Sequence, residues 1–425
     1  MTIALGLVPV VLLLIGFPIF LVLLTGVSVA LIWVMNVPLA ALHQNLFGSI
    51  NAYALLAIPY FIYAGELMGR GSVAQRLVDF MQGFTGSVRG GLGVTTVGTA
   101  TLFGAISGVS AAAVATVGKV MYPAMQRAGY PSAFSAGLIT AVGAIDIIIP
   151  PSIPMIVYGA AAEESVPRLY AAGIIPGLLI AGLLSCYVIW YAKRRNIGEV
   201  ESLTWSRIWR GFCRGAWALG APVIILGGIY GGIFSPTEAA AVACVYAIFV
   251  TMLVFRELTW RDICAAAGAT AIFTAQILII VSCAGLFSWV LTVNQVPAAL
   301  VAWLQHSELP AWMFLLTVNI LLLFVGCFLD PLSAILLLTP LLIPLVKALQ
   351  ISTVHFGVVM MVNLAIGLFH PPFGINIFVA QSVLGIRLET IYRGIVPFVL
   401  LYLVALALIT YVPDLSLAGM RLFFD

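Results

Sequence analysis

The sequence predicts an all-α protein that crosses a membrane many times and is built from two repeats. Hydrophobic residues make up 63% of the 425 residues and charged residues only 8%, whereas a soluble domain carries about a quarter charged residues. The double proline Pro150–Pro151 also has a counterpart 221 positions later, at Pro371–Pro372. A double proline breaks a helix, because it removes backbone donors and its rings clash with the preceding turn. Inside a membrane such a break persists only where protein or a polar cavity satisfies the freed backbone groups.

Other features recur at the same shift. The related pairs are Pro123 and Pro344, Gly173 and Gly394, and Pro176 and Pro397. With one residue of slippage, the glycine-containing segment 104–108 aligns with 326–330. Paired breaks at matching places in two halves are the sequence sign of a secondary transporter whose site lies between the repeats.

Charge placement predicts the topology, because Lys and Arg collect in cytoplasmic loops. The apolar run between Arg89 and Lys119 begins and ends among basic residues and is interrupted at Ser107–Ser110. It therefore predicts a re-entrant hairpin that enters from the cytoplasmic face. The run 312–345, broken at Asp330–Pro331, follows a segment without Lys or Arg and predicts a second hairpin from the outer face. Hairpins that enter from opposite faces make an inverted-topology repeat.

The remaining apolar runs predict ordinary or broken spans over residues 135–162, 170–191, 216–234, 239–255, 265–291, 356–384 and 395–411. Residues 1–36 fit either one kinked helix or two short spans broken near Gly16–Pro18. We expect this apolar N-terminus to remain in the protein as a membrane span, because it lacks the features of a cleaved signal peptide. An amphipathic helix around Trp205–Arg214 should lie in the inner interface. We also expect an ion pair between Glu66 and Arg70 and a helix cap at Glu238.

We divide the chain at these features. The predicted units are N-terminal scaffold spans (1–88), repeat 1 (89–191), an amphipathic linker with scaffold spans (192–311), repeat 2 (312–412) and a C-terminal tail (413–425). The two hairpins and two broken helices should form one moving unit, because every site-like break falls in the two repeats.

The hairpin tips carry the residues that favour ligand binding. Ser110 is a natural N-cap, and the start of the helix that follows it is suited to an anion. Asp330 followed by Pro331 is a strong helix-start signal. Carbonyl groups freed near the double prolines, together with serine hydroxyls, suit a small cation such as sodium. A single break is usually a tolerated kink, but four breaks in repeat-related pairs favour a transport site.

Composition and motifs argue against other classes. The net charge of +3 comes from basic residues scattered over short loops, so we expect no nucleic-acid partner. The six cysteines lack CxxC spacing and should be packed thiols. The sequence contains no Walker A loop, nucleophile elbow or metal-ligand cluster, so we expect neither an enzyme nor a bound cofactor. A respiratory proton pump would need more buried lysines than Lys119, Lys193 and Lys347 provide, and an ion channel would favour an oligomeric pore repeat.

Five motifs resemble the large membrane (M) subunit of tripartite ATP-independent periplasmic (TRAP) transporters, across essentially the whole chain. They are GAISGVSAAAVATVG, IIIPPSIPMIVYG, GGIFSPTEAAAVACVYA, FLDPLSAILLLTPLLIPL and GLFHPPFGINIFVAQS. The resemblance implies an elevator-type protein of the ion transporter superfamily in the bacterial inner membrane. A small four-helix membrane (Q) subunit and a periplasmic substrate-binding (P) protein would be its partners. The implied activity is sodium-driven uptake of organic acids such as C4-dicarboxylates, sialic acid or other sugar acids. A free-standing sodium- or proton-coupled carboxylate symporter of the same superfamily is the alternative.

The resemblance also implies two sodium sites, formed mostly by backbone oxygens. The first would comprise Gly104, Ser107, Asp146, Ile149 and Pro151, and the second Gly326, Gly367, His370 and Phe373. The substrate would contact Ser107, Ser110, Ser152, Asp330 and Asn376.

The sequence departs from the family at two of these positions. The family usually has a small residue where this chain has Asp146, and threonine where it has His370. An ionisable group inside a membrane is costly and therefore a candidate functional residue. Asp146 would add charge to the first sodium site or pair with a neighbour as a structural residue. Because histidine titrates near neutral pH, His370 leaves proton coupling open.

Overall fold

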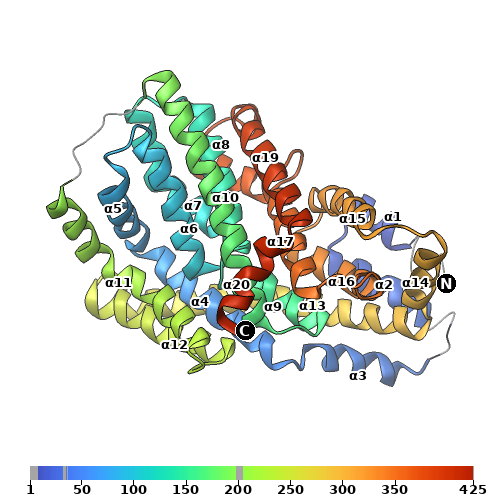
Figure 1. The fold of residues 1–425 in the computed structure, drawn as a ribbon. Helices are drawn as coiled ribbons and strands as arrows, with labels where there is room; N and C mark the ends of the chain where they lie inside the picture. Colours follow the sequence, from blue (N-terminus) through green and yellow to red (C-terminus); the bar gives the residue numbers. More distant parts are fainter. Residues whose placement is uncertain (1–7, 32–34, 36, 198–203, 425) are drawn as a thin grey trace.

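The computed structural model describes residues 8–31, 35, 37–197 and 204–424, and this part of the chain is helical without a strand. In Figure 1 the helices α6, α7, α8, α10 and α19 stand roughly side by side, while α3 lies at the lower right of the view, below α14 and α16. Among the described residues, six helices are long and apolar enough to cross a membrane, or up to seven if one bent pair counts as a span. The predicted fold class, a polytopic all-α membrane protein, is confirmed.

The N-terminal region consists of short helices. A break at Gly16, whose φ is +88°, separates the first two, so the described residues contain two short helices and not one kinked helix. A 62° bend separates α3 from the following 3₁₀ turn and α4. The elements are α1 (Val8–Ile15), α2 (Ile19–Val29), α3 (Leu39–Ile50), η3 (Tyr53–Leu56), α4 (Ala57–Arg70) and α5 (Val73–Thr85).

Each of the two predicted repeats contains five α-helices, and the first also contains a 3₁₀ turn. Repeat 1 comprises α6 (Gly91–Ser107), α7 (Ser110–Arg127), α8 (Ser132–Val142), the 3₁₀ turn η4 (Gly143–Ile147), α9 (Ile153–Ala162) and α10 (Val166–Arg195). Repeat 2 comprises α15 (Ala311–Gly326), α16 (Pro331–Ala348), α17 (Thr353–Phe369), α18 (Ile375–Leu384) and α19 (Leu388–Tyr411). The chain breaks at both expected hairpin tips and at both double prolines.

The segment between the repeats differs from the sequence prediction. We expected an amphipathic helix followed by a separate span, but α11 (Trp205–Tyr230) runs through both. Gly211 and Gly215 allow α11 to lie along α5: a Cβ at Gly211 would come within 2.9 Å of the Asp79 carbonyl oxygen, and one at Gly215 within 2.8 Å of the Phe80 Cβ. This close packing continues across the expected boundary and leaves no break.

The remaining elements complete the scaffold and the C-terminus. They are α12 (Pro236–Ile248), its π-helical continuation η5 (Phe249–Val254), α13 (Trp260–Val293), α14 (Val296–His306) and α20 (Asp414–Phe424). The expected C-terminal tail is thus a helix, and it packs on α10, with Gly419 against the Ala171 carbonyl.

Two local predictions are confirmed. Glu66 and Arg70 form an ion pair at 2.8 Å. Glu238 completes a capping box at the start of α12, where it accepts from the backbone N–H of Ser235 at 2.8 Å.

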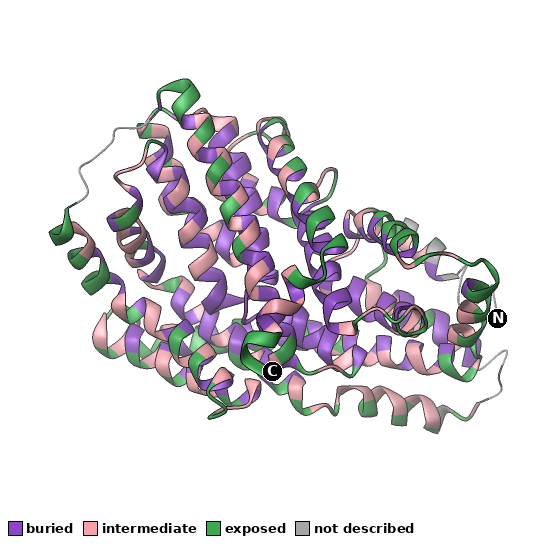
Figure 2. Ribbon diagram, in the orientation of Figure 1, coloured by how far each residue is buried: buried purple, intermediate pink, exposed green. Residues whose placement is uncertain are grey.

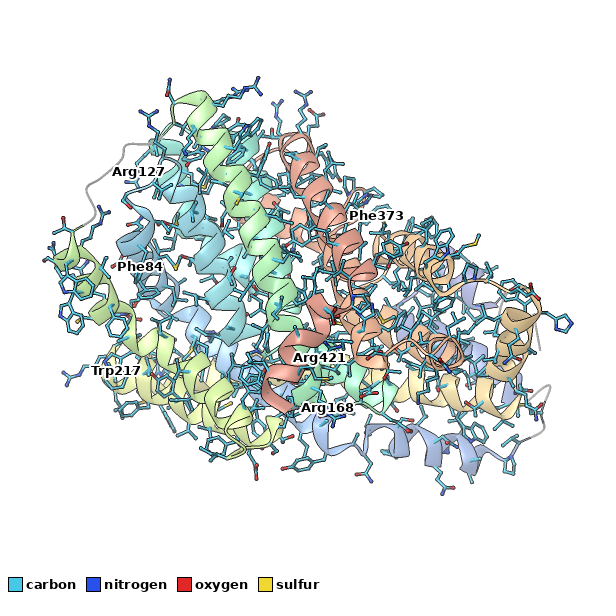
Figure 3. All side chains as sticks on the ribbon, viewed as in Figure 1. Phe84, Arg127, Arg168, Trp217, Phe373 and Arg421 are labelled. Carbon is cyan, nitrogen blue, oxygen red and sulfur yellow. The ribbon has the colours of Figure 1, made fainter. Side chains whose placement is uncertain are left out.

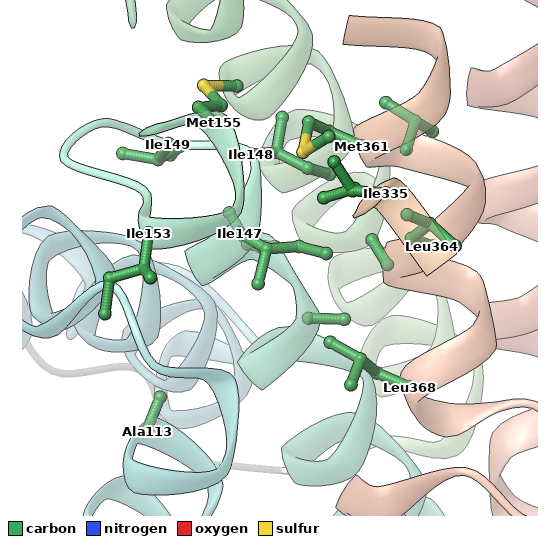
Figure 4. Packing of buried hydrophobic residues seen from close by; sticks show 14 of the residues in the cluster. Ala113, Ile147, Ile148, Ile149, Ile153, Met155, Ile335, Met361, Leu364 and Leu368 are labelled. Carbon is green, nitrogen blue, oxygen red and sulfur yellow. The ribbon is translucent and has the colours of Figure 1, made fainter. Parts of the chain in front are cut away.

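The core lies where the two repeats interlock, and Figure 2 shows it as a nearly continuous buried interior through the central helices. α8 of repeat 1 presses directly on α19 of repeat 2, because Gly394 leaves room for the Ala133 carbonyl. The Tyr402 hydroxyl donates to the Ala141 carbonyl oxygen at 2.9 Å. Figure 4 shows buried side chains around the first break, with Ile148 close to Met361 of α17. Each broken helix is therefore held by elements of the other repeat.

Candidate functional site

A cavity of about 570 Å³ lies where both hairpin tips and both broken helices meet α2 and α13. Three of the five residues expected at the substrate line it: Ser110, Asp330 and Asn376. Most of the other lining side chains are apolar, including Phe20 and Ile277 from the surrounding scaffold. Residues far apart in the sequence thus meet at one site between the repeats, as the paired breaks predict.

The tip of the first hairpin is joined to the second broken helix by hydrogen bonds. The Asn376 Nδ2–H group donates to Ser110 Oγ at 2.8 Å and to the Thr140 carbonyl oxygen at 3.2 Å. Ser110 Oγ is also 3.0 Å from Asn376 Oδ1, to which its hydroxyl donates. Both side chains are buried. This contact spans the two repeats at the wall of the cavity.

Beside the cavity, three of the residues expected at the first sodium site lie together. Asp146 is fully buried, and the Ser107 hydroxyl is 3.5 Å from its Oδ2. Its other oxygen, Oδ1, has no hydrogen-bond partner among the described residues. A Cβ at Gly104 would lie 2.5 Å from that oxygen. A buried, unpaired charge is very costly, so this carboxylate requires a cation or a proton. The donor set fits a small cation.

The other two residues of this set lie on the broken segment. The Pro151 carbonyl oxygen is 2.7 Å from the position of a Cβ at Gly108, whose φ of +60° allows the hairpin tip to approach it. The Ile149 amide donates to the Ile145 carbonyl oxygen at 3.0 Å. The Ile149 side chain packs against Gly177 of α10. Pro151 therefore lies at the hairpin tip, while the side chain of Ile149 faces α10.

The residues expected at the second sodium site surround the second break. Gly326 and Gly367 let α15 and α17 cross closely, because a Cβ at Gly367 would lie 2.6 Å from the Gly326 carbonyl oxygen. The His370 carbonyl oxygen accepts from the Gly374 amide at 3.2 Å. The Phe373 side chain is 55% exposed. It packs on Phe328, with the ring centroids 5.8 Å apart.

The imidazole of His370 faces the tip of the second hairpin. Its Nδ1 is 3.3 Å from Cys327 Sγ and 2.5 Å from the Pro371 carbonyl oxygen. The side chain thus connects the hairpin to the double proline, while the His370 carbonyl accepts from within the break. Its role at a sodium site stays a prediction.

Two serines expected at the substrate, Ser107 and Ser152, are not among the residues that line the cavity. The Ser152 hydroxyl donates to the Ile147 carbonyl oxygen at 2.7 Å and caps α9 by accepting from the Met155 amide at 3.4 Å. Ser107 accepts from the Val109 amide at 3.2 Å. Both serines hold the shape of the breaks, and their contact with substrate stays a prediction.

Sequence reasoning missed two residues at this site. Gln276, on α13, lines the cavity opposite the repeats. An isolated amide within a long apolar run was the signal that could have revealed it. Gly65, on α4, packs closely against the backbone of Ser107. A Cβ at this position would lie 2.9 Å from the Ser107 Cα, so only glycine leaves enough room. That contact had no local signal.

The fold and site together define a membrane transport protein of the repeat-containing kind, with broken helices around a central cavity. Residues 7–415 match the sequence model of the family described as the tripartite ATP-independent periplasmic transporter, DctM component, and the chain belongs to this family. It is therefore a TRAP transporter large permease.

Individual relatives agree with this assignment. The C4-dicarboxylate TRAP transporter large permease protein of Pseudomonas aeruginosa is 42% identical over 88% of each chain. The isethionate TRAP transporter permease protein DctMQ of Oleidesulfovibrio alaskensis is 39% identical over 90% of this chain and 60% of its own. Among solved structures, the YdaH transporter of Alcanivorax borkumensis has the same fold, with a TM-score of 0.67 at 16% identity over 98% of this chain and 99% of that one.

Proposed function

We propose that this chain carries an organic acid across the bacterial inner membrane together with sodium, after a periplasmic binding protein has delivered the acid. The observation that carries the proposal is the cavity shared by both hairpin tips and both broken helices, with the orphaned oxygen of Asp146 beside it. An anion site next to a cation site within one moving unit is the minimum that sodium-coupled uptake requires.

The backbone around the cavity favours an anionic substrate. Four helices begin at residues that line the cavity: α7 at Ser110, α9 at Ile153, α16 at Pro331 and α18 at Ile375. The first N–H groups of a helix and its dipole attract negative charge. Neither Lys nor Arg is among the described lining residues, so these helix starts would supply most of the attraction. The relatives named for C4-dicarboxylates and isethionate are consistent with an organic acid.

Asp146 supports sodium as the coupling ion. A carboxylate 4 Å from a cation gains roughly 4 kcal/mol at the effective dielectric of a partly solvated protein site. Hydroxyl and carbonyl oxygens from Ser107 and the first double proline would complete the coordination without titrating. His370 would act in the second site through its backbone.

The small Q subunit and the periplasmic P protein are proposed as partners from the family assignment. The relative named DctMQ is longer than this chain, which spans 60% of its length. That difference is consistent with a second membrane component fused to the permease in that protein.

Uptake into proteoliposomes tests the proposal. The chain is reconstituted alone, with its Q subunit, and with both partners, and labelled C4-dicarboxylates, sulfonates and sugar acids are offered under an inward sodium gradient. We expect substantial uptake of at least one acid only with both partners and sodium. Full-rate uptake by the isolated chain would instead identify a free-standing symporter.

A further inference from the structure

One wall of the cavity at the candidate site lies outside the two repeats and carries a single polar side chain among its described residues. α2 and α13 form this wall, and Gln276 of α13 is its polar residue. The other described side chains on the wall, among them Phe20 and Phe273, are apolar. Figure 3 shows Arg127 at the upper left of the molecule and Arg168 near its lower edge, and neither lines the cavity. Gln276 is therefore the group on this wall that can form hydrogen bonds with a bound molecule.

The position of Gln276 on α13 is unfavourable for a side chain in contact with lipid. It lies near the middle of a 34-residue apolar helix that runs from Trp260 to Val293. Phe273, Gln276 and Ile277 recur at helical spacing on the face that lines the cavity. An amide at such a depth has no water with which to bond, and leaving it unpaired in hydrocarbon is costly. Polar side chains within membrane spans mark substrate paths.

The amide of Gln276 is also free to bind a ligand. Its side chain is exposed, and none of the hydrogen bonds between described residues involves it. The three other polar side chains among the described lining residues are already bonded within the protein. Ser110 and Asn376 bond to each other, and Asp330 accepts from the Ser333 amide at 3.1 Å. Gln276 is thus the polar lining side chain whose donors and acceptor all remain available.

The two walls of the cavity offer different chemistry. The wall formed by the repeats has the starts of α7, α9, α16 and α18, whose N–H groups suit a carboxylate. The opposite wall has one primary amide, which provides two N–H donors and one carbonyl acceptor. An acid held by the helix starts would therefore meet Gln276 only through a second polar group on the same molecule.

α13 is attached to the N-terminal helices. The Ser282 hydroxyl donates to the Leu46 carbonyl oxygen of α3 at 2.7 Å. The Tyr63 hydroxyl of α4 donates to the Ile263 carbonyl oxygen at 3.3 Å. Gln276 therefore lies outside the unit that we expect to move, and its contact with substrate would be lost when that unit moves away from the middle of α13.

We propose that Gln276 contacts the substrate and selects organic acids that carry a second polar group. The inference rests on the proposed function, because it assigns a specificity residue to the same cavity. The helix starts of the repeats hold the first acidic group. The Gln276 Nε2–H groups then donate to a second carboxylate or sulfonate, or its Oε1 accepts from a hydroxyl.

The accessibility of position 276 tests whether the side chain faces the cavity. The chain with its Q subunit is reconstituted as Gln276→Cys and treated with a hydrophilic methanethiosulfonate reagent, and modification of residue 276 is followed by mass spectrometry. The matched control is Ala275→Cys at the same depth, because Ala275 is exposed but does not line the cavity. We expect residue 276 to react about tenfold or more faster, since the reactive thiolate forms in water. Equal rates would place Gln276 against lipid or another subunit and overturn the proposal.

The affinity for paired acids tests the selectivity. Melting temperatures of the same complex are measured against the concentrations of succinate and isethionate, which have two polar ends, and of butyrate and ethanesulfonate, which have one. Gln276→Leu should raise the half-saturating concentration of at least one two-ended acid about tenfold, because a hydrogen bond to a charged group is lost. The one-ended acids should be unaffected. The matched control is Gln44→Leu, which changes an exposed glutamine of α3 that does not line the cavity.

Either of two results in this second experiment would overturn the proposal. One is a wild type that binds the two-ended acids no more tightly than the one-ended acids, and the other is a Gln276→Leu protein with unchanged affinities. Uptake by the wild type separates this failure from a failure of the proposed function. Sodium-driven uptake that is unchanged in Gln276→Leu would leave the proposed function standing and remove Gln276 from the site, whereas its absence in the wild type would count against the proposed function itself.

Discussion

Gly104 leaves the space that the carboxylate of Asp146 occupies. Any side chain at this position would collide with Oδ1, because a Cβ would lie 2.5 Å from it. The Oδ1 atom of the buried carboxylate has no hydrogen-bond partner among the described residues, and its Oδ2 is 3.5 Å from the Ser107 hydroxyl. Residue 104 therefore controls the distance between the first hairpin and the first broken helix.

Gly104→Ala should reduce uptake about tenfold or more, since a shift of about 1 Å in a positioned group is enough to cost that much. Gly182→Ala, on α10, is the matched control, because a Cβ there meets nothing within 4 Å. Initial uptake rates and melting temperatures are measured for both variants. Normal uptake in a correctly folded Gly104→Ala protein would contradict a tight contact at Asp146.

The residue scale is also where sequence reasoning was least complete. Ser110 and Asn376 were both expected at the substrate, but nothing in the sequence indicated that they bond to each other, because they are 266 positions apart. Asp146 could be identified as unusual because charge is rare in apolar runs. The need for glycine at positions 65 and 104 follows from close tertiary contacts that no local pattern encodes.

At the scale of elements, breaks were predictable and packing was not. Prolines, caps and charges are local signals, so the hairpin tips and both broken helices could be located from the sequence. The continuity of α11 depends on how Gly211 and Gly215 meet α5, which is a tertiary property. The helical C-terminus likewise depends on its contact with α10.

One tertiary contact between loops gives a pH-dependent prediction. Glu257, between η5 and α13, accepts from the backbone amide of Ser72 at 2.7 Å, from its hydroxyl, and from Arg76 at 3.5 Å. Burial alone raises the pKa of Glu257, but the hydrogen bonds from Ser72 and the charge of Arg76 outweigh it and leave the pKa lowered. A lowered pKa stabilises the folded state above the ordinary value of 4.5, and this stabilisation is lost as the pH falls through the lowered pKa.

Glu257→Gln should therefore lower the free energy of unfolding at pH 7 by about 1 kcal/mol. The difference between variant and wild type should shrink as the pH falls below 4.5. Melting temperatures from pH 3.5 to pH 7.5 measure this, with the exposed Glu308→Gln as control. A difference that is independent of pH would show that the charge of Glu257 is not what stabilises the contact.

At the scale of the whole molecule, the double prolines 221 positions apart predicted two repeats, and each of the two predicted repeats contains five α-helices. The interlocking of α8 with α19 was beyond prediction, because it depends on glycines in different repeats. The sidedness of the spans rests on charge alone and stays a prediction.

We predict that the two hairpins and two broken helices move together, while residues before Arg70, α11 and α12 stay in place. Structures of the complex in an inward-facing and an outward-facing state would measure this. The depths of Ser107 and Asp330 relative to Trp209 should change together between the states. If both depths stayed fixed, an elevator mechanism would be ruled out.

The most direct test of the account is the rate of uptake into proteoliposomes as a function of sodium concentration, with the proton gradient set separately. Sodium alone should drive uptake in the wild type. Asp146→Asn should raise the sodium concentration needed for the half-maximal rate, because the charge beside the first site is lost. His370→Thr should leave uptake intact, because the backbone carbonyl remains. Uptake that ignores sodium, follows the proton gradient and vanishes in both variants would contradict the account and identify Asp146 and His370 as proton carriers.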